Sequence, residues 1–243
     1  MLNVDLHTHT IASGHAMNTA YEMIQAAKSK GLELIALTDH GPKTNGGPTD
    51  SYFFILTQLP RRLFDLDVLV GCEANIIDCE GNIDLPERHL KMLDIILAGL
   101  HREAGWTQMS KEKNTEAIIA AMKNPYVNII SHPYGGANEV DMDRLVKASQ
   151  EYCVPLEVNC LHLGYYERRG ADVKDVRNMI SLVRENHWKL VISSDAHIAS
   201  MIGDDSVIDR LDLRRLLSKE IILNSSQQDV RKLLEEKRKT HPS

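Results

Sequence analysis

The chain has 243 residues, 43% of them hydrophobic, and a formal net charge of −6 with acidic and basic residues interspersed. This length fits one α/β barrel or two small domains, and the mild negative charge argues against a nucleic-acid-binding protein that relies on a basic face. The N-terminus lacks a secretion signal, and no apolar run approaches the ~20 residues that cross a bilayer. We therefore expect a cytoplasmic protein without a membrane partner.

Short apolar segments rich in β-branched residues recur along the chain and alternate with segments of helical periodicity. Most of them lack strict alternation, which is typical of parallel strands that are covered on both faces. The seven predicted strands are 2–6, 34–37, 68–72, 95–97, 127–130, 156–158 and 190–192. Seven strand–helix units in one series predict parallel strands, arranged as a barrel or as an open doubly wound sheet.

The helical segments carry start and stop signals. Thr19 and Glu22 match a capping box, and Gly31 supplies a stop after an apolar face at positions 23, 24 and 27. Further helices are indicated around 118–122 and 173–183. No Gly-x-Gly-x-x-Gly turn follows the first strand, which argues against dinucleotide binding. With no linker or repeat, we predict a single domain over the whole chain, 1–243, and a mobile surface loop at 43–49.

The four cysteines, Cys72, Cys79, Cys153 and Cys160, have no Cys-x-x-Cys spacing, and their density does not indicate a disulfide framework. Three of them lie in or beside apolar segments, where cysteine acts as a small buried hydrophobe. Cys160 follows a predicted strand and is the one cysteine that could instead face a functional site.

Most of the eleven histidines fall just after an apolar segment. His7 and His9 are two residues apart in an extended segment and point the same way, so they can bind one ion, and Asp195 and His197 repeat this spacing after the last strand. The C-terminal ends of parallel barrel strands meet on one face, which would bring distant residues together. The nine candidate ligands are His7, His9, His15, His40, Glu73, His101, His132, Asp195 and His197.

The types of these residues indicate a metal centre. A single histidine at a strand end is more often structural, but polar ligands after six of seven predicted strands are hard to explain in that way. Imidazole and carboxylate together suit zinc, manganese or iron, whereas calcium would require oxygen ligands alone. Nine ligands exceed the three or four protein ligands of one catalytic zinc ion, so the sequence predicts two or three ions.

The ordered set of motifs resembles the polymerase and histidinol phosphatase (PHP) superfamily. The motifs are His-Thr-His at 7–9, Thr-Asp-His at 38–40, Gly-Cys-Glu at 71–73, His at 101, Ser-His-Pro at 131–133 and Ser-Asp-Ala-His at 194–197. They span most of the chain, whose length is similar to that of the short stand-alone phosphatases with a trinuclear zinc centre. The resemblance implies a distorted, TIM-like (β/α)7 barrel.

The resemblance also implies three divalent ions, with zinc expected first and manganese or iron as alternatives. The three implied ligand sets are His7, His9, Glu73 and Asp195; Glu73, His101 and His132; and His15, His40 and His197. Glu73 would bridge the first two ions, and Glu73 and Asp195 would act in catalysis through a hydroxide held between the metals. The third ion would neutralise a phosphate oxygen.

The implied function is a metal-dependent phosphoric ester hydrolase that acts on a small phosphorylated substrate, with a phosphomonoester expected. The alternatives are a phosphodiesterase or nuclease of the same superfamily, then a metal-dependent amidohydrolase, then a non-catalytic metal-binding module. Few aromatic residues are available to stack on single-stranded nucleic acid. No lysine sits at a strand end, as many amidohydrolases require, and closed structural zinc sites are usually cysteine-rich.

Other polar residues near the strand ends have two interpretations each. Asp39 could hydrogen-bond a ligand imidazole or cap the following turn. Asn159 and His162 could line the pocket, and Arg102 is expected to be a solvated surface residue that could reach phosphate. No function is predicted for His89, His187 and His241.

Overall fold

The computed structural model describes residues 2–107, 109–134 and 138–239. In these residues seven parallel strands form one sheet in the order β1-β2-β4-β5-β6-β7-β8. The strands are β1 (Val4–Asp5), β2 (Leu34–Leu37), β4 (Leu66–Asn75), β5 (Ile95–Gly99), β6 (Ile129–Ile130), β7 (Leu156–Asn159) and β8 (Leu190–Ser193). Each predicted strand is present, and the parallel strands follow one another in the sheet as they do in the sequence.

The last strand returns to the first and nearly closes the barrel. Just beyond β1 and β8, Thr8 and Ala196 form a parallel bridge, and the His9 N–H donates to the Ala196 carbonyl at 2.9 Å. The Asp5 carboxylate adds a link by accepting from the backbone N–H groups of Ser194, at 3.1 Å, and Gly203, at 2.9 Å. The predicted single-domain, distorted (β/α)7 barrel is therefore confirmed, and the open sheet is excluded.

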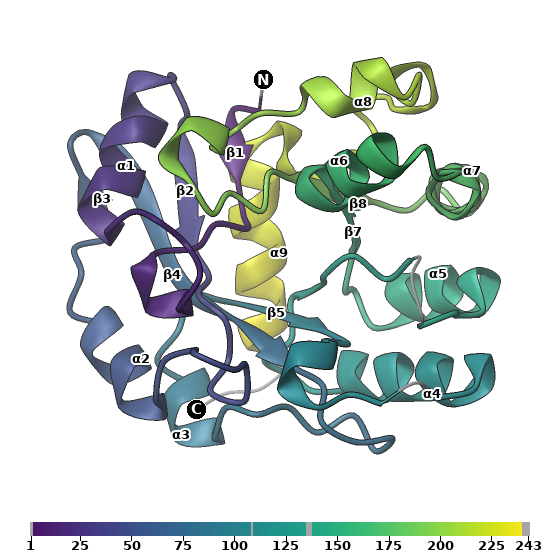
Figure 1. Ribbon diagram of the computed structural model, residues 1–243, viewed down its shortest axis with the longest axis horizontal. Coiled ribbons are helices and arrows are strands. Elements are labelled where there is room, and N and C mark those ends of the chain that lie inside the picture. The colour runs from purple at the N-terminus through teal and green to yellow at the C-terminus, as the bar shows by residue number, and fades with distance from the viewer. Residues whose placement is uncertain (1, 108, 135–137, 240–243) are drawn as a thin grey trace.

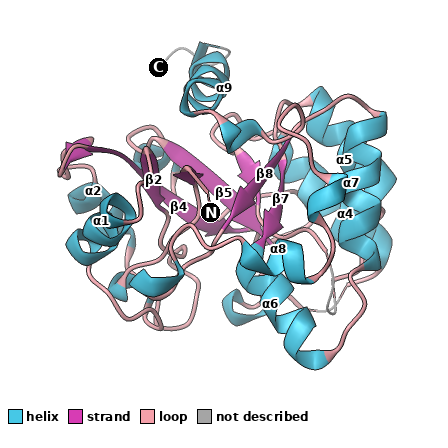
Figure 2. Ribbon diagram, turned by 90° about the horizontal axis from the view of Figure 1, so that it is seen from above, coloured by secondary structure: helices cyan, strands magenta, loops and turns pink. Residues whose placement is uncertain are grey.

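Helices cover the outside of the barrel, as the two ribbon views show (Figures 1 and 2). They are α1 (Ala20–Ser29), α2 (Asp50–Leu56), α3 (Glu87–Leu90), α4 (Lys111–Met122), α5 (Met142–Glu151), α6 (Cys160–Arg169), α7 (Lys174–Glu185), α8 (Ser206–Arg210) and α9 (Gln227–Lys239). The predicted capping box begins α1, where Thr19 Oγ1 accepts from the Glu22 N–H and the Thr19 N–H donates to Glu22 Oε2 at 2.7 Å.

The strands are buried on both faces, which explains why their sequences do not alternate. One apolar cluster fills the barrel with inward-facing residues such as Leu6, Leu34 and Leu97, and Val230 and Leu234 of α9 join it. A larger cluster packs the outer strand faces against the surrounding helices. Helix α9 lies across the N-terminal ends of the strands, because Lys237 Nζ donates to the Val127 carbonyl just before β6. The functional residues gather at the opposite end.

Some features differ from the sequence-based expectation. A short strand, β3 (Arg62–Leu63), pairs antiparallel with β4 through a tight turn and was not predicted. The segment 43–49 is a loop, but it is anchored, since the Lys43 N–H donates to Asp84 Oδ2 at 2.8 Å and Thr44 is buried. In the part of the chain that the structure describes, no helix is long and apolar enough to span a bilayer.

The cysteine expectations were partly wrong. All four are free thiols, and Cys72 and Cys160 are buried as predicted, but Cys79 is half-buried and Cys153 is exposed. Cys160 begins α6 and contributes to a small pocket beside Asp204 and Arg210, so it does not face the histidine-lined cavity. The strand end at Asn159 turns directly into the helix, which rotates the next side chain away from the barrel axis.

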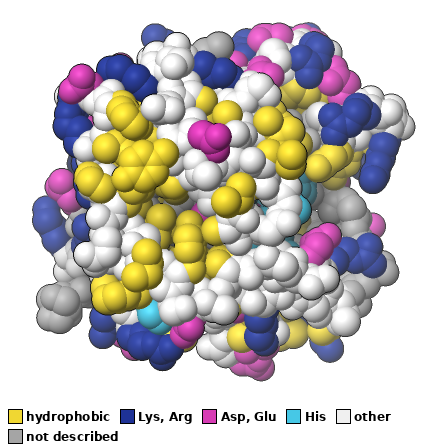
Figure 3. Space-filling view, turned by 60° about the vertical axis from the view of Figure 1, so that its left-hand side comes forward, with side chains coloured by type: hydrophobic (Ala, Val, Ile, Leu, Met, Phe, Trp, Pro, Cys, Tyr) yellow, Lys and Arg dark blue, Asp and Glu magenta, His cyan; other side chains and the backbone are white. Residues whose placement is uncertain are grey.

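The side of the barrel that carries α1 and β3 comes forward in the space-filling view of Figure 3, where hydrophobic side chains reach the surface among charged ones. Tyr21 of α1 and Phe64, which follows β3, are both exposed, and their rings lie edge to face with centroids 6.3 Å apart.

Candidate metal centre

The nine predicted ligands converge at the C-terminal end of the barrel. A cavity of about 600 Å³ lies there, and its lining includes His15, His40, Glu73, His101, His132, Asp195 and His197. His7 and His9 lie beside it, fully buried. Parallel strands that close into a barrel place their C-terminal ends around one opening, so residues up to 190 positions apart in sequence share this cavity.

Glu73 lies at the middle of the cluster. It is 1% exposed, and its two carboxylate oxygens face different histidines. Oε1 lies 3.0 Å from His101 Nε2 and 2.9 Å from His132 Nε2. Oε2 lies 3.2 Å from His7 Nε2 and 2.7 Å from His40 Nδ1. The carboxylate therefore stands between two groups of imidazoles, which is the geometry that a bridging ligand requires.

A second carboxylate, that of Asp195, lies beside the two histidines of the His-Thr-His motif at 7–9. Asp195 Oδ1 lies 3.0 Å from His9 Nε2 and 3.6 Å from His7 Nε2. Together these three side chains form a buried set whose ligand atoms all lie within 4.8 Å of one another. Asp195 has a φ of +54°, in the left-handed region that non-glycine residues rarely adopt, and such strain concentrates at functional sites.

Three further histidines lie together at the rim. His15 Nε2 is 3.2 Å from His40 Nε2 and 3.1 Å from His197 Nε2, which brings together the third predicted set. His9 also lies within 4.8 Å of His40 and His197, measured between ligand atoms. His9 thus stands between the first and third sets, while His15 is exposed at the mouth of the cavity.

The hydrogen bonds of the histidines show which nitrogen can bind an ion. His7 Nδ1 lies 2.7 Å from Glu157 Oε1, and a carboxylate only accepts, so Nδ1 carries the proton. His9 Nδ1 donates to Ser13 Oγ at 3.0 Å, because that hydroxyl uses its own proton to donate to Asp39 Oδ1 at 2.6 Å. In the neutral form of both rings the lone pair is left on Nε2, which faces the centre of the cluster.

Two other rings are held in the same tautomer. His101 Nδ1 lies 2.6 Å from Asn75 Oδ1, whose amide nitrogen is engaged with Asp84 Oδ2 at 2.6 Å, so the amide oxygen accepts. His197 Nδ1 lies 3.0 Å from the Asp195 carbonyl oxygen, which can only accept. An acceptor behind each ring that leaves Nε2 free is the arrangement found around metal-bound histidines.

The inward-facing atoms also lack partners of their own. His7 Nε2, His9 Nε2, His40 Nδ1 and Asp195 Oδ1 are buried, and although they lie close to one another or to Glu73, none of these contacts among the described residues has the geometry of a hydrogen bond. Buried polar atoms are nearly always hydrogen-bonded or bound to an ion, because leaving them unsatisfied is costly. The donor set and its orphaned atoms therefore fit divalent cations.

Electrostatics favour the ligand forms of Glu73, Asp195 and His9. Burial by itself raises the pKa of the Glu73 and Asp195 carboxyls, but the surrounding histidines hold the pKa of both well below its usual value. Burial and the neighbouring His40 lower the pKa of His9 well below its usual value. The carboxylates are thus ionised and His9 is neutral, as metal binding requires.

His7 and His101 differ from His9 in this respect. Burial lowers the pKa of His7 and His101, but neighbouring carboxylates, Glu157 at His7 and Glu73 at both, raise the pKa of these two rings above its usual value. A cation must therefore displace their protons.

Glu157 was missed by the sequence analysis. It is fully buried in β7, and besides His7 it accepts from the His132 N–H at 2.9 Å and from Asn159 Nδ2 at 3.1 Å. A signal was present, since a glutamate in the middle of the apolar strand 156–158 cannot be buried without partners. The prediction of that strand rested on its apolar residues alone.

The structure also shows where the polar residues near the strand ends with two proposed roles lie. Asp39 reaches His9 only through Ser13, and it also accepts from the Thr10 N–H at 2.7 Å, so it supports a ligand ring and the loop after β1. Neither of these bonds caps the turn that follows Asp39. Asn159 Nδ2 lies 3.1 Å from Asp195 Oδ2, and the His162 ring stacks on His132 with centroids 4.1 Å apart. Both therefore belong to the site.

The remaining residues lie elsewhere. Arg102 is exposed and lines a neighbouring pocket. His89 is buried in α3, and His187 follows α7, away from the cluster. His241 lies outside the described residues.

A nearly closed parallel barrel with a histidine and carboxylate cluster at its C-terminal strand ends defines a class of metal-site barrel proteins. Within that class, the family model described as PHP domain matches residues 5–202. The chain belongs to the PHP domain family, and the predicted resemblance is confirmed.

Comparisons with individual proteins agree with this family. A probable phosphatase of Caldanaerobacter subterraneus subsp. tengcongensis is 42% identical over 238 residues, covering 98% of this chain and 93% of the relative. Histidinol phosphate phosphatase from Lactococcus lactis subsp. lactis, complexed with zinc, L-histidinol and phosphate, has a TM-score of 0.57 at 17% identity and covers 88% of this chain and 93% of its own.

A chain from the cryo-EM structure of archaeal ribonuclease P with mature tRNA has a TM-score of 0.59 at 17% identity, covering 98% of this chain and 93% of that chain. At such identities the two solved structures show a shared fold alone.

Proposed function

We propose that this protein is a metal-dependent phosphomonoester hydrolase with three divalent ions, zinc being the expected metal. The observation that carries the proposal is the arrangement around Glu73, whose two oxygens face separate sets of histidine Nε2 and Nδ1 atoms. The proposed ligand sets are those that the family resemblance implies: His7, His9, Glu73 and Asp195; Glu73, His101 and His132; and His15, His40 and His197. The phosphatase names of its relatives support the enzyme class.

Some residues of the chain would bind the ions, and others would orient the side chains that bind them. Glu73 would join two of the sets, and Asp195 would anchor the set that includes His7 and His9. Glu157 and Ser13 fix the tautomers of those two rings, so that their lone pairs point into the cavity. When bound, divalent ions at such a centre lower the pKa of water to about 7 and neutralise phosphate oxygens.

A phosphomonoester is favoured over the alternatives by the third set of histidines. His15, His40 and His197 stand at the open rim, where a terminal phosphate group with its two negative charges could be met by an additional cation. A diester presents a single negative charge, and a neutral amide presents none. The fold shared with a ribonuclease P chain gives the nuclease alternative support at the level of architecture only.

The test is elemental analysis of protein purified without chelator, followed by turnover of para-nitrophenyl phosphate, its bis-ester and a dihydroorotate-like cyclic amide on one preparation. We expect two to three transition-metal ions per chain and the monoester to be cleaved fastest. Cleavage of the cyclic amide alone would promote the amidohydrolase, and absence of transition metal would overturn the proposal.

Glu73→Gln provides the sharpest variant, because a neutral amide bridges cations poorly. We expect it to lose ions from two sets and to lose turnover, whereas Glu235→Gln, an exposed change on α9, serves as the matched control. Full metal content and full turnover in Glu73→Gln would show that the bridging assignment is wrong.

A further inference from the structure

A second pocket, of about 390 Å³, adjoins the metal centre. The two cavities share lining residues: His101, Glu103, His132, His162 and Tyr165. Because ligand His132 and its stacking partner His162 belong to both linings, a molecule bound at the centre can extend into the second pocket without leaving the protein surface. Pockets of this size accommodate small organic molecules.

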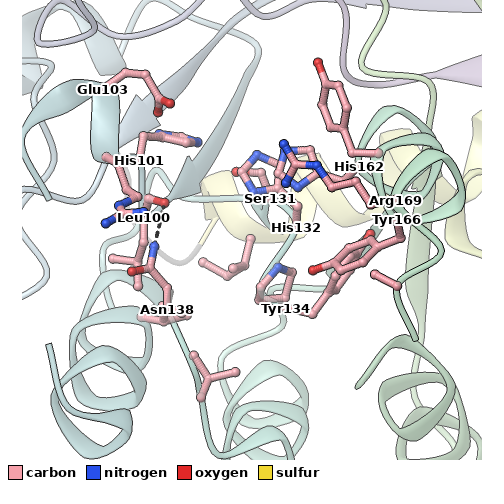
Figure 4. Close-up of a pocket in the computed structure, with 17 residues that line it drawn as sticks. Leu100, His101, Glu103, Ser131, His132, Tyr134, Asn138, His162, Tyr166 and Arg169 are labelled. Carbon is pink, nitrogen blue, oxygen red and sulfur yellow. Dashed lines mark hydrogen bonds between the residues drawn. The ribbon is translucent and has the colours of Figure 1, made fainter. Parts of the chain in front are cut away.

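The wall of this second pocket is largely apolar and aromatic. Ile118 of α4 and Ile130 of β6 are buried residues of its lining, and Tyr134 and Tyr166 add two aromatic rings. In Figure 4, Leu100 and Asn138 lie on one side, with Tyr134 and Tyr166 opposite. His101, His132 and His162 are also labelled there, and these three residues line the cavity of the metal centre as well.

Polar groups occur at defined places in this lining. Ser131 is 1% exposed, and its Oγ has no hydrogen-bond partner among the residues that the structure describes. A Cβ atom added at Gly99 would collide both with this hydroxyl and with the His101 ring, so the two groups lie close together. Because His101 is a proposed ligand, the hydroxyl lies where the pocket meets the metal centre. Arg102, Glu103 and Arg169 are exposed lining residues, so charge is confined to the outer rim.

We propose that this pocket binds the alcohol part of the substrate, and that this alcohol is a planar, largely apolar group such as an aromatic ring. The inference rests on the proposed function, since it assumes that a phosphate group occupies the neighbouring centre. An aromatic ring would bury apolar surface against Ile118, Ile130 and the tyrosines. A small alkyl alcohol would leave the pocket unfilled.

Two phosphate esters with similar leaving alcohols distinguish the contribution of binding in this pocket from the intrinsic chemical reactivity of the ester. On the zinc-loaded protein, we expect kcat/KM for 2-phenylethyl phosphate to exceed that for ethyl phosphate by about tenfold or more, the scale by which a hydrophobic pocket discriminates. As a readout independent of turnover, calorimetry should show tighter binding of 2-phenylethylphosphonate than of ethylphosphonate. Equal kcat/KM and equal affinities would overturn the inference while leaving the phosphatase function intact, whereas hydrolysis of neither ester would count against the function itself.

Ala171→Trp tests the location of the pocket. Ala171 is an exposed lining residue after α6, and its N–H donates to the Tyr166 carbonyl at 3.0 Å, a bond that any side chain leaves in place. We expect the indole to fill the pocket and to abolish the preference for the phenylethyl compounds, while Ala171→Ser retains it. A preference that survives in a folded, zinc-loaded Ala171→Trp protein would place the alcohol elsewhere. If that variant does not fold, the phosphonate comparison on the unmodified protein decides.

Discussion

Glu157→Gln isolates the role of a residue that contacts a proposed ligand but not the proposed ions. The carboxylate accepts three hydrogen bonds, from His7 Nδ1 at 2.7 Å, the His132 N–H at 2.9 Å and Asn159 Nδ2 at 3.1 Å. Glutamine has nearly the same shape but only one accepting oxygen. One side of the amide must therefore present its NH₂ group to a donor.

Both orientations of the amide are costly. If its oxygen faces His7, the NH₂ group opposes the His132 N–H and Asn159 Nδ2, and two accepting contacts are lost. If the amide is reversed, its NH₂ group faces His7 Nδ1, and the His7 proton must move to Nε2, where it blocks the lone pair that faces Glu73. A hydrogen bond to a charged group contributes about 1.5–3 kcal/mol, and loss of such a supporting partner typically lowers metal affinity about 10–100-fold.

The assay is competition with a chromophoric chelator, which yields the affinity for each ion, together with thermal unfolding of the metal-free protein to verify the fold. We expect one ion to bind about 10–100-fold more weakly in Glu157→Gln. Glu80→Gln, an exposed glutamate in the turn after β4, should behave as the unmodified protein. Unchanged affinity for all ions in a folded Glu157→Gln protein would refute the argument that Glu157 fixes the His7 tautomer.

Two further predictions address the separate ion sets and the fold. His197→Ala should remove about one ion and raise the activation free energy of single-turnover phosphate release by on the order of 2.7–4 kcal/mol, whereas His7→Ala or Asp195→Ala should abolish turnover. Loss of every ion together in His197→Ala would show that the sets are not separable. Thr19→Ala removes the N-cap of α1 and should lower the free energy of unfolding by about 1 kcal/mol in denaturant titrations with metal content unchanged, and an unaltered unfolding midpoint would contradict the contribution of the capping box.

The candidate site was largely predictable from the sequence because its members lie where strands end. His7 and His9 follow β1, Glu73 lies near the end of β4, and Asp195 and His197 follow β8. Apolar strands can be recognised locally, and a parallel barrel places all of their ends at one opening. The convergence of these residues followed from chain order and fold class, whereas their division into ligand sets was implied by the resemblance to the PHP superfamily.

Other features could not be read in this way. The hairpin that contains β3 depends on positive φ angles at Phe64 and Asp65. Aspartate tolerates such an angle, but phenylalanine rarely adopts it, so the residue types did not predict this turn. Cys160 was singled out as the cysteine that could face the site because it follows a strand, but α6 begins at that residue and its side chain points elsewhere. One residue of error in where a strand ends reverses which way a side chain points.

The sequence by itself determined the strand–helix order and the chemical identity of the ligand cluster, since both depend on residue type and local spacing. Only the tertiary structure decided that β8 closes onto β1, that Glu157 stands behind His7, and that an aromatic pocket opens beside His132. These features join residues that are far apart in the chain, through contacts that depend on packing and on the direction of each side chain. Local patterns carry no record of such contacts, because the same residue can pack against many partners until the fold selects one.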